Sequence, residues 1–347
     1  MVKNIDIQMK YVKNILKNIE VTQMSYSNYC SVKNYQSDLT IKQMYTETFN
    51  KDSKNLKISK LSGGLKNAVY LIEDDTQKIT LKIAPKDETK MITVDRKILW
   101  WEAEMLKLME TINFPSPKLL CYNDKSEICP FPHMFMSYIS GNNYLESKSN
   151  LSQTEIEKIE YQLGRLSSII CSIKGEKFFL PGQPNKKFNN NYEFVLNLFE
   201  LLLGDAREQN INLGVNGYNK ILDIIESNKT SLNNITNLCL SHTDIWDGNV
   251  IIRNGNVAGI VDFSDLYYCD ELLTFYFHTI DGKTSNNFLK GFNNKQLNYD
   301  EKIRIEIYRM YVILKMIVDC ELKQYGKFDW MYENLNSRMD VLQKIKK

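Results

Sequence analysis

The densest group of polar residues within an apolar frame lies over residues 240–263. This segment reads L-S-H-T-D-I-W-D-G-N, continues with the apolar runs V-I-I and V-A-G-I-V, and ends on D-F. Its candidate proton acceptors and cation ligands are His242, Asp244, Asn249 and Asp262. These residues stand beside the apolar runs and not within them, so the segment predicts polar loops carried by short strands.

A hairpin is expected to bring the two ends of this segment together. Asn254-Gly255 separates the two apolar runs, and this dipeptide favours a two-residue turn between antiparallel strands. Asp262 then comes near Asn249, and an amide oxygen beside a carboxylate suits Mg²⁺, which takes few protein ligands. Asp244 remains to accept a proton from an attacking hydroxyl, which is the division of roles in phosphoryl transfer.

The pattern H-x-D-x-x-x-x-N followed by I-V-D-F resembles the signature of the aminoglycoside phosphotransferase and choline kinase-like family. W-D-G-N is also similar to the corresponding motif of fructosamine kinases. The resemblance implies a protein-kinase-like fold, ATP or GTP as phosphate donor, and Mg²⁺. It implies that Asp244 is the catalytic base and that Asn249 and Asp262 bind the metal. His242 then supports the shape of the catalytic loop.

The same family offers an interpretation of the first half of the chain. The run L-S-G-G-L-K-N-A-V-Y resembles its nucleotide loop, in which glycines let backbone N–H groups approach phosphate. The expected phosphate-binding residues there are Ser62, Gly63 and Gly64. Lys82, in L-K-I, resembles the lysine that pairs with the phosphates, and Glu102 the helical glutamate that pairs with that lysine, with Glu104 as the neighbouring alternative.

The resemblance extends from about Lys57 to Phe277 and includes a hinge between two lobes. In F-M-S-Y-I-S-G, the backbones of Ser137 and Ile139 are expected to meet the adenine edge. Two positions depart from the family pattern, because Cys171 stands where the family often has His and Thr274 where it often has a second acidic residue. Both departures lie on the acceptor side and leave the acceptor open.

The elements that must position these residues follow from local patterns. Apolar runs bounded by Gly or Asp turns predict strands over 56–61, 68–72 and 78–83, and another strand is expected over 134–139. Helical spacing covers 100–109, and S-Q-T-E from Ser152 has capping-box spacing at the start of a further helix. No proline follows residue 184, which permits the long helices expected over 191–209, 217–227 and 301–325.

These elements and the resemblance together predict an α+β, two-lobe protein-kinase-like fold. The small N-lobe is β-rich, and the larger C-lobe is mainly helical. We expect a helical N-terminal extension over residues 1–45 that packs on the N-lobe. The nucleotide-binding N-lobe then covers 46–138, and the C-lobe, with the catalytic and acceptor-binding residues, covers 139–347.

Composition excludes several other classes of protein. Lys and Arg number 44 against 42 Asp and Glu, so the net charge of +2 gives no bias toward nucleic acid or anionic membrane. Three histidines nearly exclude a His-rich metal site, and seven cysteines without a CxxC pair argue against a disulfide framework. No apolar run approaches the roughly 20 residues of a membrane span. The start MVKNIDIQMKYVKN lacks an apolar leader, so a cytoplasmic protein is expected.

The acceptor is the least defined part of the prediction. Asp265 and Asp270 follow the metal aspartate, and Asp319 lies on the last long helical pattern, so these three would form an acidic wall for a polycationic aminoglycoside. Aromatic residues that would instead cage a quaternary ammonium are Trp246, Tyr267, Tyr268 and Tyr276.

We therefore predict an ATP- and Mg²⁺-dependent kinase that phosphorylates a hydroxyl of a small molecule. The leading assignment is the aminoglycoside phosphotransferase family, with antibiotic resistance as the associated role. The alternative is a metabolic kinase for choline, ethanolamine, a fructosamine or another hydroxylated metabolite. A catalytically inactive binding module is the third hypothesis, and the complete set of Lys82, Glu102, Asp244, Asn249 and Asp262 argues against it.

Overall fold

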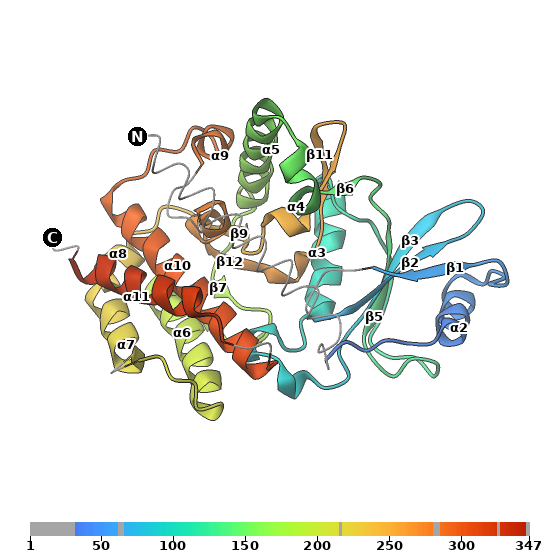
Figure 1. Cartoon of the computed structure of the whole chain (residues 1–347), viewed down its shortest axis with the longest axis horizontal. Coiled ribbons are helices and arrows are strands. Elements are labelled where there is room, and N and C mark those ends of the chain that lie inside the picture. Colours follow the sequence, from blue (N-terminus) through green and yellow to red (C-terminus); the bar gives the residue numbers. More distant parts are fainter. Residues whose placement is uncertain (1–31, 62–65, 215–216, 280–284, 325–326, 345–347) are drawn as a thin grey trace.

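The computed structural model describes residues 32–61, 66–214, 217–279, 285–324 and 327–344 (Figure 1). It confirms the α+β, two-lobe architecture, with an antiparallel sheet on one side of the molecule and most helices on the other (Figure 1). The predicted extension is described only from residue 32, and Ser62, Gly63 and Gly64 lie outside the described residues.

The N-lobe is built on a five-stranded sheet of order β1-β2-β3-β5-β4, with all pairs antiparallel. Its strands are β1 (Lys57–Lys60), β2 (Ala68–Glu73), β3 (Lys78–Ile83), β4 (Leu119–Asn123) and β5 (His133–Ser137). Its helices are α2 (Asp38–Phe49) and α3 (Leu99–Thr111). The predicted strands over 56–61, 68–72 and 78–83 and the helix over 100–109 are thus confirmed, while β4 was not predicted.

Strand β5 separates two apolar cores because successive side chains of a strand point to opposite faces. Phe135 packs in the core that α2 covers, whereas Met134 and Met136 belong to the larger core that continues through α3 into the C-lobe. Helix α2 buries Ile41, Met44 and Tyr45 against the sheet. It therefore continues across the boundary predicted at residue 45, because its apolar face is part of the N-lobe.

The C-lobe consists of helices around two small antiparallel sheets. The helices are α4 (Tyr144–Ser147), α5 (Gln153–Cys171), α6 (Asn191–Glu208), α7 (Gly217–Ser227), α8 (Lys229–Asn233), α9 (Asn286–Gly291), α10 (Tyr299–Leu322) and α11 (Asp329–Lys344). One sheet has the order β8-β7-β12-β9, from Lys187–Phe188, Phe178–Phe179, Leu266–Asp270 and Leu238–His242. The other has the order β11-β10-β6, from Asn256–Ile260, Val250–Arg253 and Asn142–Asn143.

Short 3-10 segments connect these elements at several points. They cover Glu88–Lys90, Thr93–Asp95, Lys148–Asn150, Asp247–Asn249, Phe263–Asp265 and Glu271–Thr279. Two of them, Asp247–Asn249 and Phe263–Asp265, directly precede β10 and β12 and carry candidate site residues. Several of the predicted site residues therefore lie in or beside short 3-10 segments and not within long helices or strands.

Several C-lobe helices and turns begin or end at the residues that local sequence patterns predicted. Ser152 and Glu155 form the expected capping box of α5. Asn254 and Gly255 have φ values of 53° and 66°, and the strands they connect pair at Arg253 and Asn256, as a two-residue turn with positive φ requires. The last long helix begins at Tyr299 and ends at Leu322, which shifts the predicted 301–325 toward the N-terminus.

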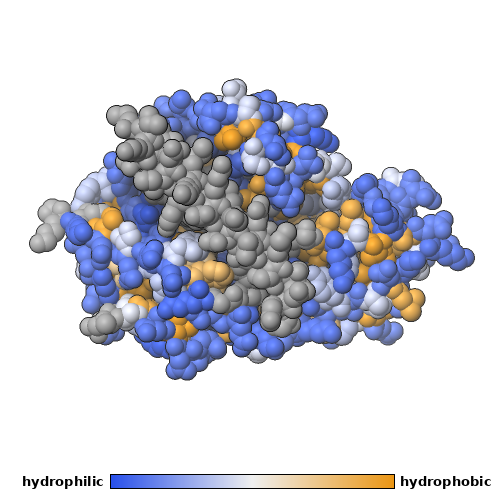
Figure 2. Space-filling model, in the orientation of Figure 1, coloured by the Kyte–Doolittle hydropathy of each residue, from blue (hydrophilic) through white to orange (hydrophobic). Residues whose placement is uncertain are grey.

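The surface is mostly polar on the face shown in Figure 2, with hydrophobic residues in smaller groups between the hydrophilic ones. This agrees with a chain in which 25% of the residues are charged. Among the described helices, none combines the length and the apolar character that crossing a bilayer requires.

Candidate active site

Lys82 lies on the central strand β3 and points toward the junction of the two lobes. Its side chain is 7% exposed, and its Nζ atom is 2.6 Å from Glu102 Oε2 and 2.8 Å from Asp262 Oδ1. A buried ammonium requires such partners, because desolvation without them is costly. Glu104 instead pairs with Lys107 on the exposed side of α3, so Glu102 is the glutamate that meets Lys82.

Lys82 favours the charged form of both carboxylates, whereas Asp262 disfavours the charged form of Glu102. Burial alone would lower the pKa of Lys82, but Asp262 and Glu102 outweigh it and raise that pKa above its ordinary value. Burial raises the pKa of Glu102 to about 7, while Lys82 acts in the opposite direction. Burial also disfavours ionised Asp262, but Lys82 and Lys66 hold the pKa of that carboxyl below its usual range. Lys82 and Asp262 therefore form an ion pair at neutral pH.

Asp244 is half-buried at the start of the loop between β9 and β10. Its backbone N–H donates to His242 Nδ1 at 3.2 Å. The Asn249 side-chain amide donates to the Asp244 carbonyl at 2.9 Å and to its Oδ2 at 2.8 Å. Burial and the nearby carboxylates of Asp265 and Asp262 raise the pKa of Asp244. A carboxylate with a raised pKa is a stronger base, which suits proton abstraction.

Buried side chains and hydrogen bonds fix the loop that carries Asp244. His242 is 1% exposed, and burial lowers its pKa to about 4, so its ring is neutral at physiological pH. The Thr274 hydroxyl donates to the His242 carbonyl at 2.8 Å. Thr243 donates to the Asp265 carbonyl from both its N–H, at 2.8 Å, and its hydroxyl, at 2.9 Å. Thr274, which departs from the family pattern, thus supports the loop.

Asn249 and Asp262 come together as the hairpin predicted. Val250 pairs with Ile260, and the Val261 N–H donates to the Asn249 carbonyl at 2.9 Å. Asp262 has φ 66° and ψ 72°, a left-handed conformation that is costly for a residue with a Cβ atom and that recurs at functional sites.

The oxygen atoms of this pair fit a hard cation. Asp262 Oδ1 accepts from Lys82 and Ser264, whereas Asp262 Oδ2 and Asn249 Oδ1 accept no hydrogen bond from the described residues. One carboxylate and one amide oxygen suit Mg²⁺, which fills its other positions with water and phosphate oxygens. The described residues hold no group of three His, Cys, Asp or Glu side chains that would bind a metal without such additional ligands.

The predicted hinge residues differ in their backbone contacts. The Ser137 N–H donates to the Lys118 carbonyl at 2.9 Å, so this donor is occupied within the sheet. Ile139 makes no backbone hydrogen bond with another described residue, and its side chain packs on Gly259 of β11. Ile139 is therefore the better candidate for a backbone contact with adenine.

The predicted acidic wall does not form as expected. Asp270 is 1% exposed, and its Oδ2 accepts from Arg304 Nε at 2.7 Å and from the Tyr308 hydroxyl at 2.8 Å. Its placement at the cleft was wrong, because a buried arginine captures it inside the C-lobe. Asp319 of α10 is paired at 2.7 Å with Lys323, the residue that directly follows the helix.

The predicted aromatic cage does not form among the described side chains either. Tyr267 is 1% exposed, and its hydroxyl donates to Asp265 Oδ1 at 2.9 Å. Tyr268 packs against the ring of Trp101, and Trp246 lies over Gly248. The side chain of Tyr276 lies outside the described part of the structure.

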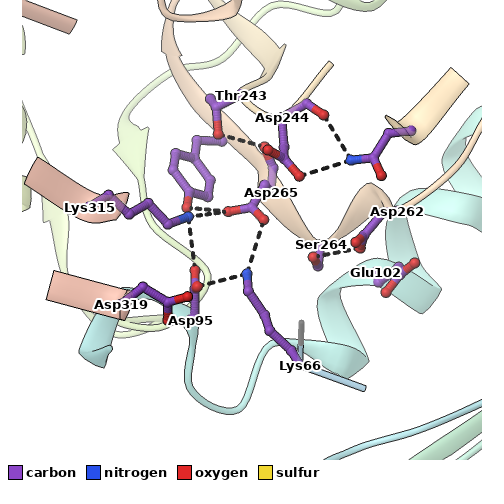
Figure 3. Close-up of polar contacts among 12 residues, drawn as sticks. Lys66, Asp95, Glu102, Thr243, Asp244, Asp262, Ser264, Asp265, Lys315 and Asp319 are labelled. Atoms are coloured by element: carbon purple, nitrogen blue, oxygen red, sulfur yellow. Dashed lines mark hydrogen bonds and ion pairs between the residues drawn. The ribbon is translucent and has the colours of Figure 1, made fainter. Parts of the chain in front are cut away.

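Asp265 belongs to a group of four charged residues that the sequence did not predict. We call Lys66, Asp95, Asp265 and Lys315 the charge cluster (Figure 3). The members come from the segment before β2, the segment before α3, the segment after Asp262, and helix α10. Lys315 interrupts the apolar run Tyr311–Val318, and a lysine within such a run indicates a buried charge.

Trp101 is a second residue that sequence reasoning missed. Its indole N–H donates to the Leu266 carbonyl at 2.7 Å, and its ring packs against Phe179 and Tyr268. Because Trp101 precedes Glu102 and Leu266 follows Asp262 by four positions, this bond aligns the helix that carries Glu102 with the segment that carries Asp262. Tryptophan is common in ordinary cores, so no local pattern distinguished it.

Comparison with known proteins gives a family and a set of similar structures. A model of the phosphotransferase enzyme family matches residues 57–273. No curated protein sequence matches the chain. A putative fructosamine-3-kinase from Haemophilus somnus 129PT is similar in structure, with a TM-score of 0.64 and 18% identity over 87% of this chain and 96% of that one.

Two aminoglycoside phosphotransferases are also similar in structure. The streptomycin–ATP ternary complex of APH(2")-IIa has a TM-score of 0.57 and 18% identity over 90% of this chain and 98% of that one. A thermostable mutant of APH(4)-Ia with AMP-PNP and hygromycin B has a TM-score of 0.60 and 13% identity, covering 88% and 100%. At these identities the likeness concerns the fold, which the three proteins share with this chain.

Proposed function

Because the chain belongs to the phosphotransferase enzyme family, we propose that it transfers the γ-phosphoryl group of ATP to a hydroxyl of a small molecule. One observation carries this proposal. Lys82 contacts Glu102 and Asp262, which lie 20 and 180 positions away in the sequence. An ion-paired lysine of this kind is the group that holds phosphates in kinases. With ATP as donor, the proposed location is the cytoplasm.

Each residue of the site has a role in the proposed reaction. Lys82 binds the phosphates, and Glu102 orients Lys82. Asn249 and Asp262 would hold Mg²⁺, which, when bound, neutralises charge on the phosphate oxygens. Asn249 also orients Asp244 through the hydrogen bond to its carboxylate.

Asp244 is the proposed base. It accepts the proton of the acceptor hydroxyl as that oxygen bonds to the γ-phosphorus and the bond from phosphorus to the ADP oxygen breaks. The raised pKa of Asp244 supports this role, because burial and neighbouring carboxylates increase the proton affinity of its carboxylate.

Two classes of acceptor are in question. The residues of the catalytic motif and the similar structures that contain aminoglycosides favour an aminoglycoside as acceptor. With that acceptor the chain would be an antibiotic-resistance enzyme. The ion pairing of Asp265, Asp270 and Asp319 favours a metabolite with fewer ammonium groups, such as a fructosamine. Choline, ethanolamine and other hydroxylated metabolites belong to the same alternative.

The test is a coupled ADP-release assay with the full chain, ATP and Mg²⁺. The acceptors are kanamycin, streptomycin, choline, ethanolamine and a fructosamine, and the Asp244→Asn variant measures the background. Acceptor-dependent ADP release that this variant lacks supports the proposal. If no acceptor stimulates ADP release and the chain fails to bind Mg²⁺-ATP in calorimetry, the chain is not a phosphotransferase.

A further inference from the structure

The charge cluster is a closed arrangement in which each lysine contacts both aspartates. Lys66 Nζ is 2.7 Å from Asp95 Oδ2 and 3.4 Å from Asp265 Oδ2. Lys315 Nζ is 3.0 Å from an oxygen of each of the same two carboxylates. Two positive and two negative charges therefore balance within the cluster (Figure 3).

The cluster lies beside the proposed catalytic base. Figure 3 shows Asp265 next to Asp244, with Asp262 on one side and Lys315 on the other. The backbone carbonyl of Asp265 also holds Thr243, the neighbour of Asp244. The nucleotide phosphates belong on the side of Asp262 in the proposed function. A compound that brings its hydroxyl to Asp244 from the opposite side therefore meets the cluster.

Burial decides which charges of the cluster such a compound meets. The side chains of Lys66 and Lys315 are each 20% exposed, whereas those of Asp95 and Asp265 are 1% and 2% exposed. The two lysines are thus the members of the cluster that a compound outside it can contact, whereas the two carboxylates are covered.

The pKa shifts of Lys66, Lys315 and Asp265 all favour the charged forms of these side chains. Burial would lower the pKa of each lysine, but the two aspartates raise the pKa of both Lys66 and Lys315 above the ordinary value. Burial would raise the pKa of Asp265, but Lys315 and Lys66 hold it well below its usual range. Neither lysine gives up its charge at neutral pH, so an ammonium group of a ligand would meet the two charged lysines, and the carboxylates that attract ammonium groups are already paired with them.

We propose that Lys66 and Lys315 are specificity-determining residues that exclude polycationic acceptors. The acceptor is accordingly a hydroxyl compound that is neutral or carries a single positive charge. This inference rests on the proposed function, because it assigns the acceptor class of the same site. It replaces the acidic wall with a carboxylate pair that the chain's own lysines already occupy.

The experiment compares acceptors of graded charge in wild type and variants. Kanamycin represents a polycation, a fructosamine a singly charged acceptor, and a free sugar a neutral one. Lys315→Met removes one ammonium from the cluster and Lys315→Arg keeps the charge. Lys302→Met is the matched control, because Lys302 lies on the same helix, is exposed and is not a member of the cluster.

In wild type, kanamycin at low salt is expected to bind and react at least tenfold more weakly than the best neutral or singly charged acceptor. Lys315→Met should strengthen kanamycin binding by about tenfold or more, the scale expected for removing a like charge at close range. Lys315→Arg and Lys302→Met should behave as wild type. Circular dichroism establishes that each variant is folded.

Calorimetric titration of kanamycin into the AMP-PNP-loaded chain gives a readout that needs no turnover. Wild type that binds kanamycin as tightly as Lys315→Met, or that prefers kanamycin among the acceptors, overturns the inference while phosphotransfer itself stands. If Lys315→Met is unfolded, the wild-type titration alone decides, because tight kanamycin binding contradicts the exclusion. Loss of Mg²⁺-ATP binding in wild type would instead refute the proposed function.

Discussion

Lys82 and Asp262 meet across 180 positions of sequence, with 2.8 Å between the ammonium nitrogen and a carboxylate oxygen. The contact joins the central strand of the N-lobe sheet to the end of the C-lobe hairpin. It therefore links the proposed phosphate-binding and metal-binding residues directly.

Asp244→Ala should lower kcat by about 10²–10⁴-fold, because it removes the proposed general base. Affinity for Mg²⁺-ATP should change little, since Asp244 forms hydrogen bonds with Asn249 and His242 and none with Lys82, Glu102 or Asp262. Steady-state kinetics with the best acceptor and calorimetry with AMP-PNP measure the two quantities. A variant with near-parental kcat would remove Asp244 from the mechanism.

Asp262→Asn should weaken Mg²⁺-dependent nucleotide binding more than Asn249→Ala. The first change removes a negative charge opposite a dication in a partly dry cleft, whereas the second removes a neutral ligand. Titration of nucleotide binding with Mg²⁺ checks the order. Superimposable titration curves for wild type and Asp262→Asn would contradict the assignment of Asp262 as a ligand.

Lys82→Met and Glu102→Gln should be strongly non-additive in the apparent KM for ATP. The two groups touch at 2.6 Å, and contacting charged pairs show coupling energies of about 0.5–3 kcal/mol. Glu104→Gln is the matched control, because Glu104 pairs with Lys107 on the exposed surface. Lys82→Met combined with Glu104→Gln should be additive. Equal coupling in both cycles would mean that the Lys82–Glu102 contact is not specific.

The free energy of unfolding should fall as the pH drops below about 6.5, in part through His133. His133 is fully buried, and burial lowers its pKa in the folded state. Since the folded pKa lies below the unfolded one, its contribution is present above the unfolded pKa and is lost as the pH falls. His133→Gln should reduce this loss.

Urea unfolding of both proteins between pH 8 and pH 5 measures the difference. His133 contributes at most about 1.4 kcal/mol per pH unit to the slope. His242, which is also buried, contributes to both proteins and cancels in the comparison. Identical pH profiles would show that His133 does not titrate differently in the two states.

Local patterns were sufficient for much of the fold. The strand runs, the capping box at Ser152 and the turn at Asn254-Gly255 each depend on neighbouring residues, so the sequence displays them directly. The same holds for the Asn249–Asp262 pair, because a hairpin brings these residues together. Helix α11 was missed although its buried residues Met331, Leu335, Met339 and Leu342 have helical spacing.

Contacts between distant segments were beyond such patterns. Asp270 stands where the sequence suggests a cleft residue, but Arg304, 34 positions later, binds it inside the C-lobe. Lys66 and Asp265 are 199 positions apart, and no local signal pairs them. Their charges are defined by tertiary packing, which is why the acceptor class could not be read from the order of acidic residues.

The hydrogen bond from Trp101 to Leu266 has a consequence for motion within the enzyme. The segment before α3 is tied to the C-lobe as well, because Thr93 donates to Asp205 of α6 from its N–H at 2.7 Å and from its hydroxyl at 2.6 Å. Helix α3 is thereby anchored to the C-lobe at its beginning and just before it. If the five-stranded sheet moves relative to the C-lobe, a helix anchored in this way stays with the C-lobe, and the Lys82–Glu102 distance measures the movement.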